Sequence, residues 1–545
     1  MRAPMAPTGL VDPSGRSISR FDVARARSHA NAGGAMGASF EAGSTGGAYF
    51  SEWPAALRSA DREWLPSRVP ATARIRERVR NDPVARAGAE RRKNSAVGRG
   101  WKVKFRPNAR ALGISLEAAR ELGAKLTTEF ELYSYGHAFT SDATRRGTFG
   151  QQLRQAVSHL VIDGEALGLA EWAPDESTRY ATRLRLVDPA RLCNPNGRTN
   201  SDTLRDGIEL NAAEVPIRYH IRERMAGDFA GIGQFRWKAF DRWTEWGRPQ
   251  VFHCFEADQA GQSRGISRFV SVLKSFRALS KFTDATIESA TINALIVAFM
   301  KSNGGPQAVS ENFESPQMKA HEEWRQNYYE NNPVNLASGA RIPVLPYGDE
   351  LELQTASRDV GSFDAFVRSI IRLIAAALGV TYEELSMDYS QTNYSSARAA
   401  MIHAWAETVS LMGLAEDQLV RPFCVAWAEE AFDRGYVQVP AGAPDFYDAV
   451  DAYVQIRCIG PGKGVIDGVK EIDAMAGRIE LGVSTLEDEC EELGRDPDEV
   501  MEQRARERDR LEELGLPLPG GALAGIAQTA RDPAHSASLD QRATA

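Results

Sequence analysis

The segment from Thr381 to Asn393 is polar and lies between two stretches with helical patterns. It offers acids, amides, hydroxyls and a phenol, and the next Lys or Arg after it is Arg398. Lys and Arg bind phosphates tightly and in a salt-dependent way, whereas carboxylates repel them. The segment therefore predicts only light contact with a polyanion. The alternative is a loop that packs between subunits, since polarity alone is only correlated with loop function. The side chains concerned are Glu383, Glu384, Asp388, Tyr389, Gln391, Thr392 and Asn393.

Other patterns that could do chemistry are incomplete. Gly460-Pro-Gly-Lys-Gly464 resembles a phosphate loop, but its spacing differs from GxxxxGK[ST] and no Ser or Thr follows Lys463, which favours a turn entering a helix. His321-Glu-Glu-Trp-Arg325 has Arg325 where a zinc hydrolase places its second His. No Gly-x-Ser-x-Gly elbow is recognised at a strand-to-helix turn. We therefore predict that the protein is not an enzyme and holds no metal or cofactor. A carboxylate metal site stays open, because acids are abundant.

The composition indicates a soluble protein of several domains. The chain has 545 residues, 43% of them hydrophobic and 25% charged, and a net charge of −8. A sequence-specific DNA-binding protein would usually be basic. The five cysteines are scattered and form no CxxC pair, which predicts free thiols in a reducing compartment. No signal peptide is recognised, and the apolar run Ala294–Met300 is far shorter than the ~20 residues of a membrane span. We expect a protein that is neither secreted nor membrane-spanning.

Three long helices are predicted around the polar segment. From Arg268 to Lys301 no Gly or Pro occurs, and Ser267 is placed to cap this helix, which would be on the order of 50 Å long. A second helix carries its apolar residues from Phe363 to Leu378 at positions i, i+3 and i+4 and ends at Gly379. A small insertion, residues 302–357, separates the two. After the polar segment, a helix is predicted over 396–434 with a kink at Pro422.

The remaining segments predict a mixed α/β region and an acidic helical end. Residues 1–48 and 517–545 are predicted to be flexible. Residues 74–104 hold eleven basic and three acidic residues, a net charge of +8, and Pro83 marks a helix start. This basic segment is either a patch for an acidic partner or a solvated helix face. Residues 471–513 carry a net charge of −10, and the two segments could pair between subunits. Strands are predicted at 160–162, 166–170, 182–187, 216–221, 250–255, 436–440 and 454–459.

Four blocks, in the same order, resemble the lambda-like family of tailed-phage portal proteins. They are Arg80–Ala89 with Val97–Gly100, Phe255–Glu256 with Gly261–Ser267, Leu378–Leu385 with Asp388–Ser390 and Asn393–Arg398, and Gly460–Gly464 with Leu481–Thr485. The resemblance spans about residues 50 to 514. One departure is Thr381, which stands where the family often has Pro and is expected to loosen the entry to the loop. The stretch 228–247 matches no part of the family that we can place.

The resemblance implies an α+β multidomain portal fold. Its parts would be an α/β wing, a two-helix stem, a small α+β clip and a helical C-terminal crown region. The boundaries would be a flexible arm at 1–48, the wing at 49–266, the first stem helix at 267–301, the clip at 302–357, the second stem helix at 358–380, a tunnel loop at 381–396, the wing helix and crown region at 397–516, and a flexible tail at 517–545.

The resemblance also implies a role and partners. The chain would form a ring, typically of twelve subunits, at one capsid vertex of a virion assembled in the host cytoplasm. The ring would pass double-stranded DNA without sequence specificity during packaging and ejection. Tunnel-loop residues facing the DNA would be Glu384, Asp388, Tyr389, Gln391, Thr392 and Asn393. The clip, with His321, Trp324, Arg325 and Tyr328, would dock the terminase large subunit and later a head-completion or adaptor protein. Major capsid and scaffolding proteins would also be partners, and no membrane would be.

Two alternatives belong to other classes. A packaging-associated nucleic-acid enzyme, such as a terminase or nuclease subunit, would need a phosphate loop or a tight carboxylate cluster. A head–tail adaptor would usually be much shorter and lack the paired long helices. A cellular gene-transfer particle could use the same kind of protein, and the sequence does not separate that case from a phage.

Overall fold

The computed structural model describes residues 56–225, 236–300, 327, 360–390, 392–465 and 467–516. The chain divides into two compact units, residues 1–63 and residues 64–545. Of the first unit only residues 56–63 are described, and they include the start of a helix that begins at Ala60.

Helices make up most of the described chain. They are α2 (Ala60–Asn81), α3 (Pro83–Val97), α4 (Ala109–Leu112), α5 (Leu116–Tyr135), α6 (Phe149–Asp163), α7 (Phe269–Met300), α9 (Val360–Leu378), α10 (Tyr382–Ser386), α11 (Tyr394–Ala415), α12 (Arg421–Asp433), α13 (Val450–Tyr453), α14 (Gly468–Glu480), α15 (Leu486–Glu492) and α16 (Pro497–Glu513). Short 3₁₀ segments are η2 (Pro189–Arg191), η3 (Pro195–Gly197) and η5 (Phe446–Asp448).

In the described part of the chain, the strands form three small antiparallel sheets. They are β1 (Lys102–Phe105), β2 (Glu165–Trp172), β3 (Thr182–Val187), β4 (Leu204–Arg205), β5 (Ile208–Leu210), β6 (Pro216–Arg222), β7 (Trp237–Asp241), β8 (Val251–Phe255) and β9 (Ile456–Ile459). Their orders are β1-β9, β3-β2-β8 and β4-β5-β6-β7. In the central sheet Leu167 pairs with Val187 on one side and with His253 on the other. The fold is therefore mixed α and β, as predicted.

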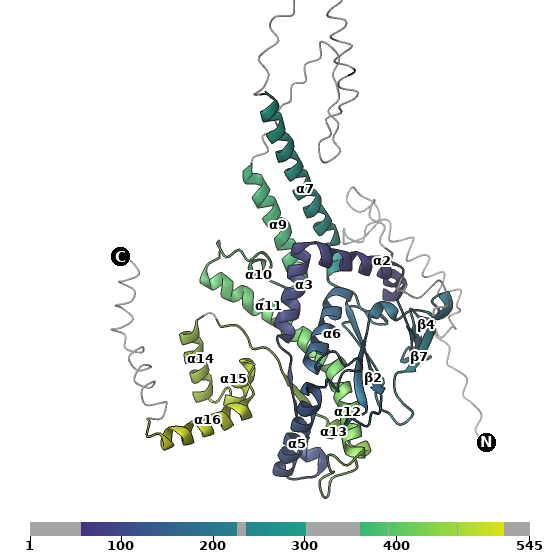
Figure 1. Cartoon of the computed structure of the whole chain (residues 1–545), viewed down its shortest axis with the longest axis vertical. Helices are drawn as coiled ribbons and strands as arrows, with labels where there is room; N and C mark the ends of the chain where they lie inside the picture. Colours follow the sequence, from purple (N-terminus) through teal and green to yellow (C-terminus); the bar gives the residue numbers. More distant parts are fainter. Residues whose placement is uncertain are drawn as a thin grey trace, which may run out of the picture. The chain divides into compact units, whose positions relative to one another are not determined.

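Helices α7 and α9 lie side by side and lead away from the mixed α/β part (Figure 1). Their contact is aromatic, because the ring of Phe282 stacks on that of Phe363 at 5.4 Å and lies 4.4 Å from that of Phe366. The predicted start of the first long helix and the predicted end of the second are confirmed. Ser267 caps the first helix, with its hydroxyl accepting from the Phe269 amide, and Gly379 ends the second with a φ of 67°. The insertion 302–357 lies outside the described residues, apart from Asn327.

The main core lies between the helices and the central sheet. Trp427 of α12 is fully buried and is surrounded by the rings of Phe105, Phe130, Tyr133 and Tyr180 at 5.0–6.1 Å. Aromatic rings at these separations add stabilisation beyond that of the area they bury. The core thereby joins β1, α5 and β3 to the helix that continues from α11.

Two strand predictions are wrong. Residues 160–162 belong to α6, because a Thr148–Gln151 capping box starts that helix and their apolar side chains continue its buried face. Residues 436–440 form no strand, because the Val437 amide bonds back to the Ala431 carbonyl and closes the end of α12. The other predicted strands are found, with small shifts of boundary.

The long helix predicted over 396–434 is interrupted where its kink was expected. A π-helical turn, η4 (Glu416–Val420), separates α11 from α12, and Pro422 lies in the first turn of α12. A proline has no amide hydrogen to donate, so it fits the first turn of a new helical segment and not the interior of an unbroken one.

Candidate functional site

The polar segment begins with a short helix that the sequence prediction treated as loop. Thr381 is the N-cap of α10, with its hydroxyl accepting from the Glu384 amide at 3.0 Å. The Glu384 carboxylate accepts from the Thr381 amide at 3.0 Å, which completes a capping box. The expectation that Thr381 loosens the loop entry is therefore wrong, because this side chain fixes it. Glu384 is also engaged with the backbone and is not a free acid on the loop surface.

Replacing Thr381 with alanine should destabilise α10 by about 1 kcal/mol, because the Glu384 amide loses its acceptor. Hydrogen exchange of the amides of residues 383–385 should become faster, while exchange in α12 stays unchanged. Thr381→Ser keeps the acceptor and is the matched control. Equal exchange in the alanine and serine variants would contradict the capping role.

The described residues between α10 and α11 are held by local hydrogen bonds. Asp388 accepts from the Ser390 amide at 3.1 Å and from the Tyr382 hydroxyl at 3.3 Å. The Thr392 hydroxyl donates to the Glu383 carboxylate at 2.8 Å. Hydrogen bonds from Ser390 lower the pKa of Asp388, so its negative charge is retained well into the acid range. The segment thus presents a fixed negative charge beside Tyr389, whose side chain is 57% exposed.

The predicted loop residues come together, with one exception. Asp388, Tyr389 and Thr392 lie between α10 and α11, and Asn393 caps α11 by accepting from the Ser396 amide at 2.9 Å. Gln391 lies outside the described residues. So do the four predicted docking residues of the insertion, His321, Trp324, Arg325 and Tyr328.

Helix α3 packs against the end of α9 and against α10 at a glycine. A Cβ on Gly88 would lie 2.7 Å from the Leu378 side chain and 3.5 Å from that of Leu385, so the missing side chain allows α9 and α10 to approach α3 closely. Leu378 and Leu385 are both buried at this contact. At the other side of the turn, Arg268 at the start of the long helix pairs with Glu407 of α11 at 2.6 Å. These contacts join α9 and α10 to α3, and α11 to the residue before α7.

The sequence did not predict the cations that lie close to the loop. The guanidinium of Arg91 lies 2.7 Å from the Met387 sulfur, and that of Arg372 lies 5.3 Å from the centre of the Tyr382 ring. Arg91, Arg92 and Lys463 line a cavity of about 380 Å³ between α3, α11 and the glycine turn 460–464. Burial and the positive charge of Arg268 lower the pKa of Arg92 to about 10. Arg368 and Arg372 stand one turn apart on α9, and this spacing is the one signal in the sequence that could have placed two cations near α10.

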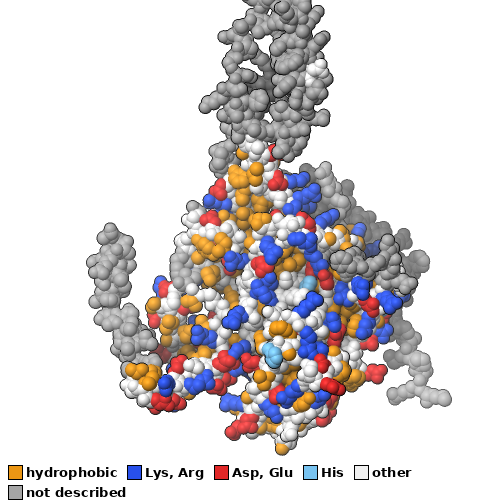
Figure 2. All heavy atoms as spheres, viewed as in Figure 1, with side chains coloured by type: hydrophobic (Ala, Val, Ile, Leu, Met, Phe, Trp, Pro, Cys, Tyr) orange, Lys and Arg blue, Asp and Glu red, His pale blue; other side chains and the backbone are white. Residues whose placement is uncertain are grey.

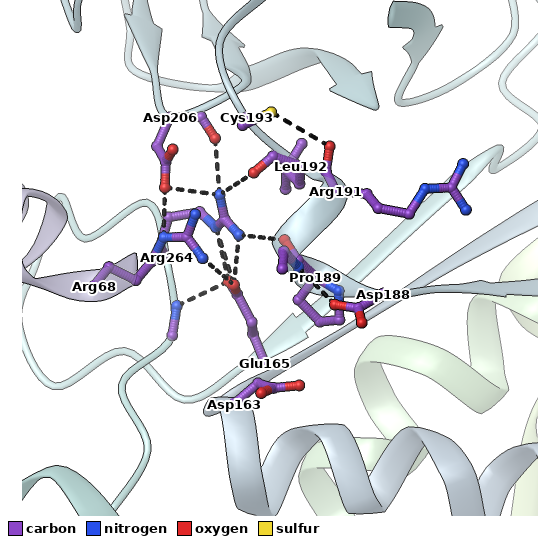
Figure 3. A network of polar contacts seen from close by, with 12 residues as sticks. Arg68, Asp163, Glu165, Asp188, Pro189, Arg191, Leu192, Cys193, Asp206 and Arg264 are labelled. Carbon is purple, nitrogen blue, oxygen red and sulfur yellow. Dashed lines mark hydrogen bonds and ion pairs between the residues drawn. The ribbon is translucent and has the colours of Figure 1, made fainter. Parts of the chain in front are cut away.

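A buried ionic network lies where the mixed α/β part meets the start of α7 (Figure 3). Arg264 is fully buried and its guanidinium contacts Glu165 at 2.6 Å, Asp206 at 2.9 Å, and the carbonyls of Leu192 and Pro189 at 2.9 Å each. Arg68 adds a second guanidinium, 2.5 Å from Asp206. Burial alone would raise the pKa of Glu165, but the charge of Arg264 and hydrogen bonds from His253 and Arg264 outweigh it and keep that pKa below its usual value.

The segment Gly261-Gln-Ser-Arg-Gly265 does have the Gly-x-Ser-x-Gly spacing, between β8 and α7, and the sequence prediction overlooked it. A nucleophile elbow exposes its serine on a strained turn. Ser263 is only 9% exposed and its φ is not positive. The segment serves instead as the junction that carries Arg264. Among the described residues, no cluster of three His, Cys, Asp or Glu side chains is arranged to hold a metal ion.

The basic and acidic segments, which were predicted to pair between subunits, form ion pairs within a single chain. Lys104 of the basic segment pairs with Asp496 and Asp498, and Lys102 pairs with Glu499. These pairs attach the start of α16 to β1. The five cysteines are free thiols, three of them buried. Within the described part of the chain, none of the helices combines the length and the apolar character that a membrane span requires.

Comparison with known proteins agrees with the family resemblance of the motifs. The chain is 30% identical to Portal protein B of Escherichia phage lambda over 515 residues, which cover 93% of this chain and 96% of that protein. It is 31% identical to the Portal protein of Escherichia phage N15 over 482 residues, which cover 87% of this chain and 90% of that one.

Solved structures with a detectable likeness include chains from gene transfer agent particles. One is a chain from the virion of a native gene transfer agent particle, with 13% identity and a TM-score of 0.36, covering 78% of this chain and 94% of that chain. The sequence comparisons carry the assignment. The model of the lambda family of phage portal proteins matches residues 47–411, and the chain therefore belongs to that family.

Proposed function

We propose that copies of this chain form a ring-shaped conduit at one capsid vertex of a virion, and that double-stranded DNA enters and leaves the capsid through it. Members of the family are structural proteins rather than enzymes. The observation that carries the proposal is the family match over residues 47–411, and a polar loop that begins with a capped helix at the end of a long helix pair is consistent with it. The ring would hold about twelve copies, as the resemblance implies.

The parts of the chain have proposed roles in this ring. The mixed α/β part would be the wing, α7 and α9 would form the stem, and α14 to α16 would build the crown side. Residues 302–357 would be the clip that docks the terminase large subunit and later a head-completion or adaptor protein. Residues 381–396 would face the DNA, with major capsid and scaffolding proteins outside the ring.

Electron microscopy of the purified protein tests the ring directly. Annular particles with an open centre are the expected result. A compact monomer at every concentration and under every assembly condition would refute the proposal. A divalent-metal-dependent cleavage assay separates the proposal from the enzyme alternative, because a nuclease would cut DNA under conditions in which a conduit leaves it intact.

The loop would act as a low-friction collar. Asp388 keeps its negative charge and Tyr389 projects a phenol, so neither side chain binds phosphate strongly. The nearby cations Arg372 and Arg91 are engaged with Tyr382 and Met387. A duplex of any sequence could then pass with little adhesion, because adhesion would need phosphates to be neutralised by Lys or Arg.

Replacing Tyr389 with lysine should slow DNA passage. Each copy would add one cation beside the duplex, and the logarithm of DNA affinity should fall more steeply with salt, by about 0.9 for each phosphate neutralised. Packaging rate and salt-dependent DNA binding by purified rings are the measurements. Tyr389→Gln is the matched control, and it should package at nearly the normal rate. Asn393 is a poorer position for this test, because it caps α11.

Equal packaging rates and equal salt slopes in the lysine and glutamine variants would contradict the collar and favour a loop that packs between subunits.

A further inference from the structure

Helix α14 carries an apolar stripe that nothing in the described chain covers. The stripe is made of Val469, Ile472, Ala476 and Ile479, at spacings of three, four and three residues. Val469 and Ile472 are 65% and 64% exposed, and Ala476 is exposed as well. Single exposed aliphatic residues are ordinary on protein surfaces, but a row of them along one helix face marks a contact surface.

Helix α11 carries a second stripe of the same kind. Its members are spaced by four, three, four, three and four residues and are all exposed: Ser395, Ala399, Ile402, Ala406, Val409 and Gly413. Ile402 and Val409 are 47% and 49% exposed. No charged residue occurs on this stripe, although 25% of the whole chain is charged. Figure 2 shows hydrophobic side chains gathered where α10 and α11 lie.

The two stripes fit one another. Spacings that alternate between three and four residues place side chains along a seam where two helices can interlock at a small crossing angle. The α11 stripe offers small residues between two aliphatic ones, and the α14 stripe offers larger aliphatic side chains. Such a surface accepts the larger side chains of a partner helix between its own.

A ring supplies the partner for both stripes. Head-to-tail contacts that close into a ring require each copy to present two unlike surfaces that fit each other. One alternative occupant within the chain is residues 517–545, whose large aliphatic side chains are only Leu518, Leu523, Ile526 and Leu539. Only Leu523 and Ile526 are three residues apart, and the other intervals are five and thirteen, so these four do not form a continuous stripe.

We propose that the α14 stripe of one copy packs on the α11 stripe of the next copy, so that this helix pair is part of the contact that closes the ring. The inference rests on the proposed ring. It adds which surfaces meet and makes the helix that follows the tunnel loop a contact element between subunits. Movement of the loop in one copy would then be felt by the C-terminal helices of its neighbour.

Cysteine cross-linking between differently tagged chains tests the contact. One set of variants carries Ile402→Cys, Ala406→Cys or Val409→Cys, and the other carries Ile472→Cys, Ala476→Cys or Ile479→Cys. Mixed rings of the two sets should form covalent dimers with one chain of each tag, because a disulfide needs Cα atoms about 4.4–6.8 Å apart. The unaltered protein, with its own five cysteines, measures the background.

The outcomes separate the inference from the ring itself. Mixed-tag dimers in annular particles support the contact. Annular particles in which no pair of positions cross-links overturn the inference and leave the ring standing, whereas the absence of particles overturns both. Deleting residues 517–545 should leave cross-linking unchanged, and cross-links that appear only after this deletion would assign the stripes to that tail.

A second pair of variants removes the dependence on disulfide geometry. Ile472→Asp places a charge in the stripe and should abolish annular particles without changing the monomer's unfolding temperature. Ala474→Asp introduces the same charge at an exposed position off the stripe and should leave the rings intact. Rings in both variants would overturn the proposed contact.

Discussion

Replacing Arg264 with methionine should lower the free energy of unfolding by about 3–5 kcal/mol, which is the usual effect of removing one partner of a buried ion pair. Arg264 is fully buried and Glu165 is 1% exposed, so no water replaces the lost guanidinium. The carbonyls of Leu192 and Pro189 would also lose their donors. Urea unfolding of the purified monomer at neutral pH measures the effect.

Two further variants separate lost charge pairing from lost packing. Arg264→Met combined with Glu165→Leu should recover part of the loss, because no buried carboxylate is then left without its cation. Arg368→Met removes an exposed pair with Asp364 and should cost less than about 1 kcal/mol. Similar losses in the Arg264 and Arg368 variants would contradict the importance of burial.

The pH dependence of the Arg264→Met deficit has a definite sign. In the unaltered protein the pKa of Glu165 is lowered, so its contribution to stability is present above its ordinary pKa and is lost only as the pH falls through the lowered value. In the variant the carboxylate is buried without its main cation, and its protonation relieves that penalty. Burial raises the pKa of this unpaired carboxyl, so as the pH falls the deficit relative to the unaltered protein should begin to shrink above about 4.3, the ordinary pKa of a glutamate, and should continue to shrink below it.

The helices around the site were predictable because their signals are local. The apolar spacing from Phe363 to Leu378 and the glycine at 379 specify α9 and its end without reference to the rest of the chain. The α10 helix was missed although Thr381 and Glu384 have the spacing of a capping box, because five residues give too little periodicity to outweigh a polar composition. Short helices of this kind are specified by their caps.

The supports of the site were not predictable, because they join residues far apart in the sequence. Arg264 meets Glu165 across 99 positions, and Arg91 meets Met387 across 296. Neither pair has a spacing that a helix or a hairpin would bring together. The same holds for Gly88, whose value as a contact for Leu378 depends on how α3 is placed beneath α9. The local sequence pattern thus specifies the helices and strands. Tertiary packing determines which polar side chains remain available to bind a partner.

Replacing Gly265 with alanine should destabilise the protein by about 1–3 kcal/mol or more, the usual range for overpacking, although the change removes no polar group. A Cβ there would lie 2.1 Å from the Gly164 carbonyl oxygen and 2.8 Å from the Phe255 Cβ, and the first of these is backbone that no rotamer change can move. Thermal unfolding is the measurement. Gly477→Ala is the matched control, because a Cβ there meets nothing within 4 Å and alanine in a helix interior should add about 0.5–1 kcal/mol.

The two alanine substitutions are expected to change stability in opposite directions. Gly265→Ala also bears on the proposed ring, because of where Gly265 lies. The Gly265 amide donates to Glu165 at 3.2 Å, and its carbonyl accepts from Trp64 at 3.0 Å. A shift of Gly265 would therefore displace the Glu165 carboxylate that pairs with Arg264. Helix α7 starts four residues later, and a long helix magnifies a small change of direction at its origin. Gly265→Ala should therefore reduce the yield of annular particles even at temperatures where the chain stays folded. Normal ring yield from a destabilised Gly265→Ala chain would show that this junction contributes stability without setting the direction of the helix pair.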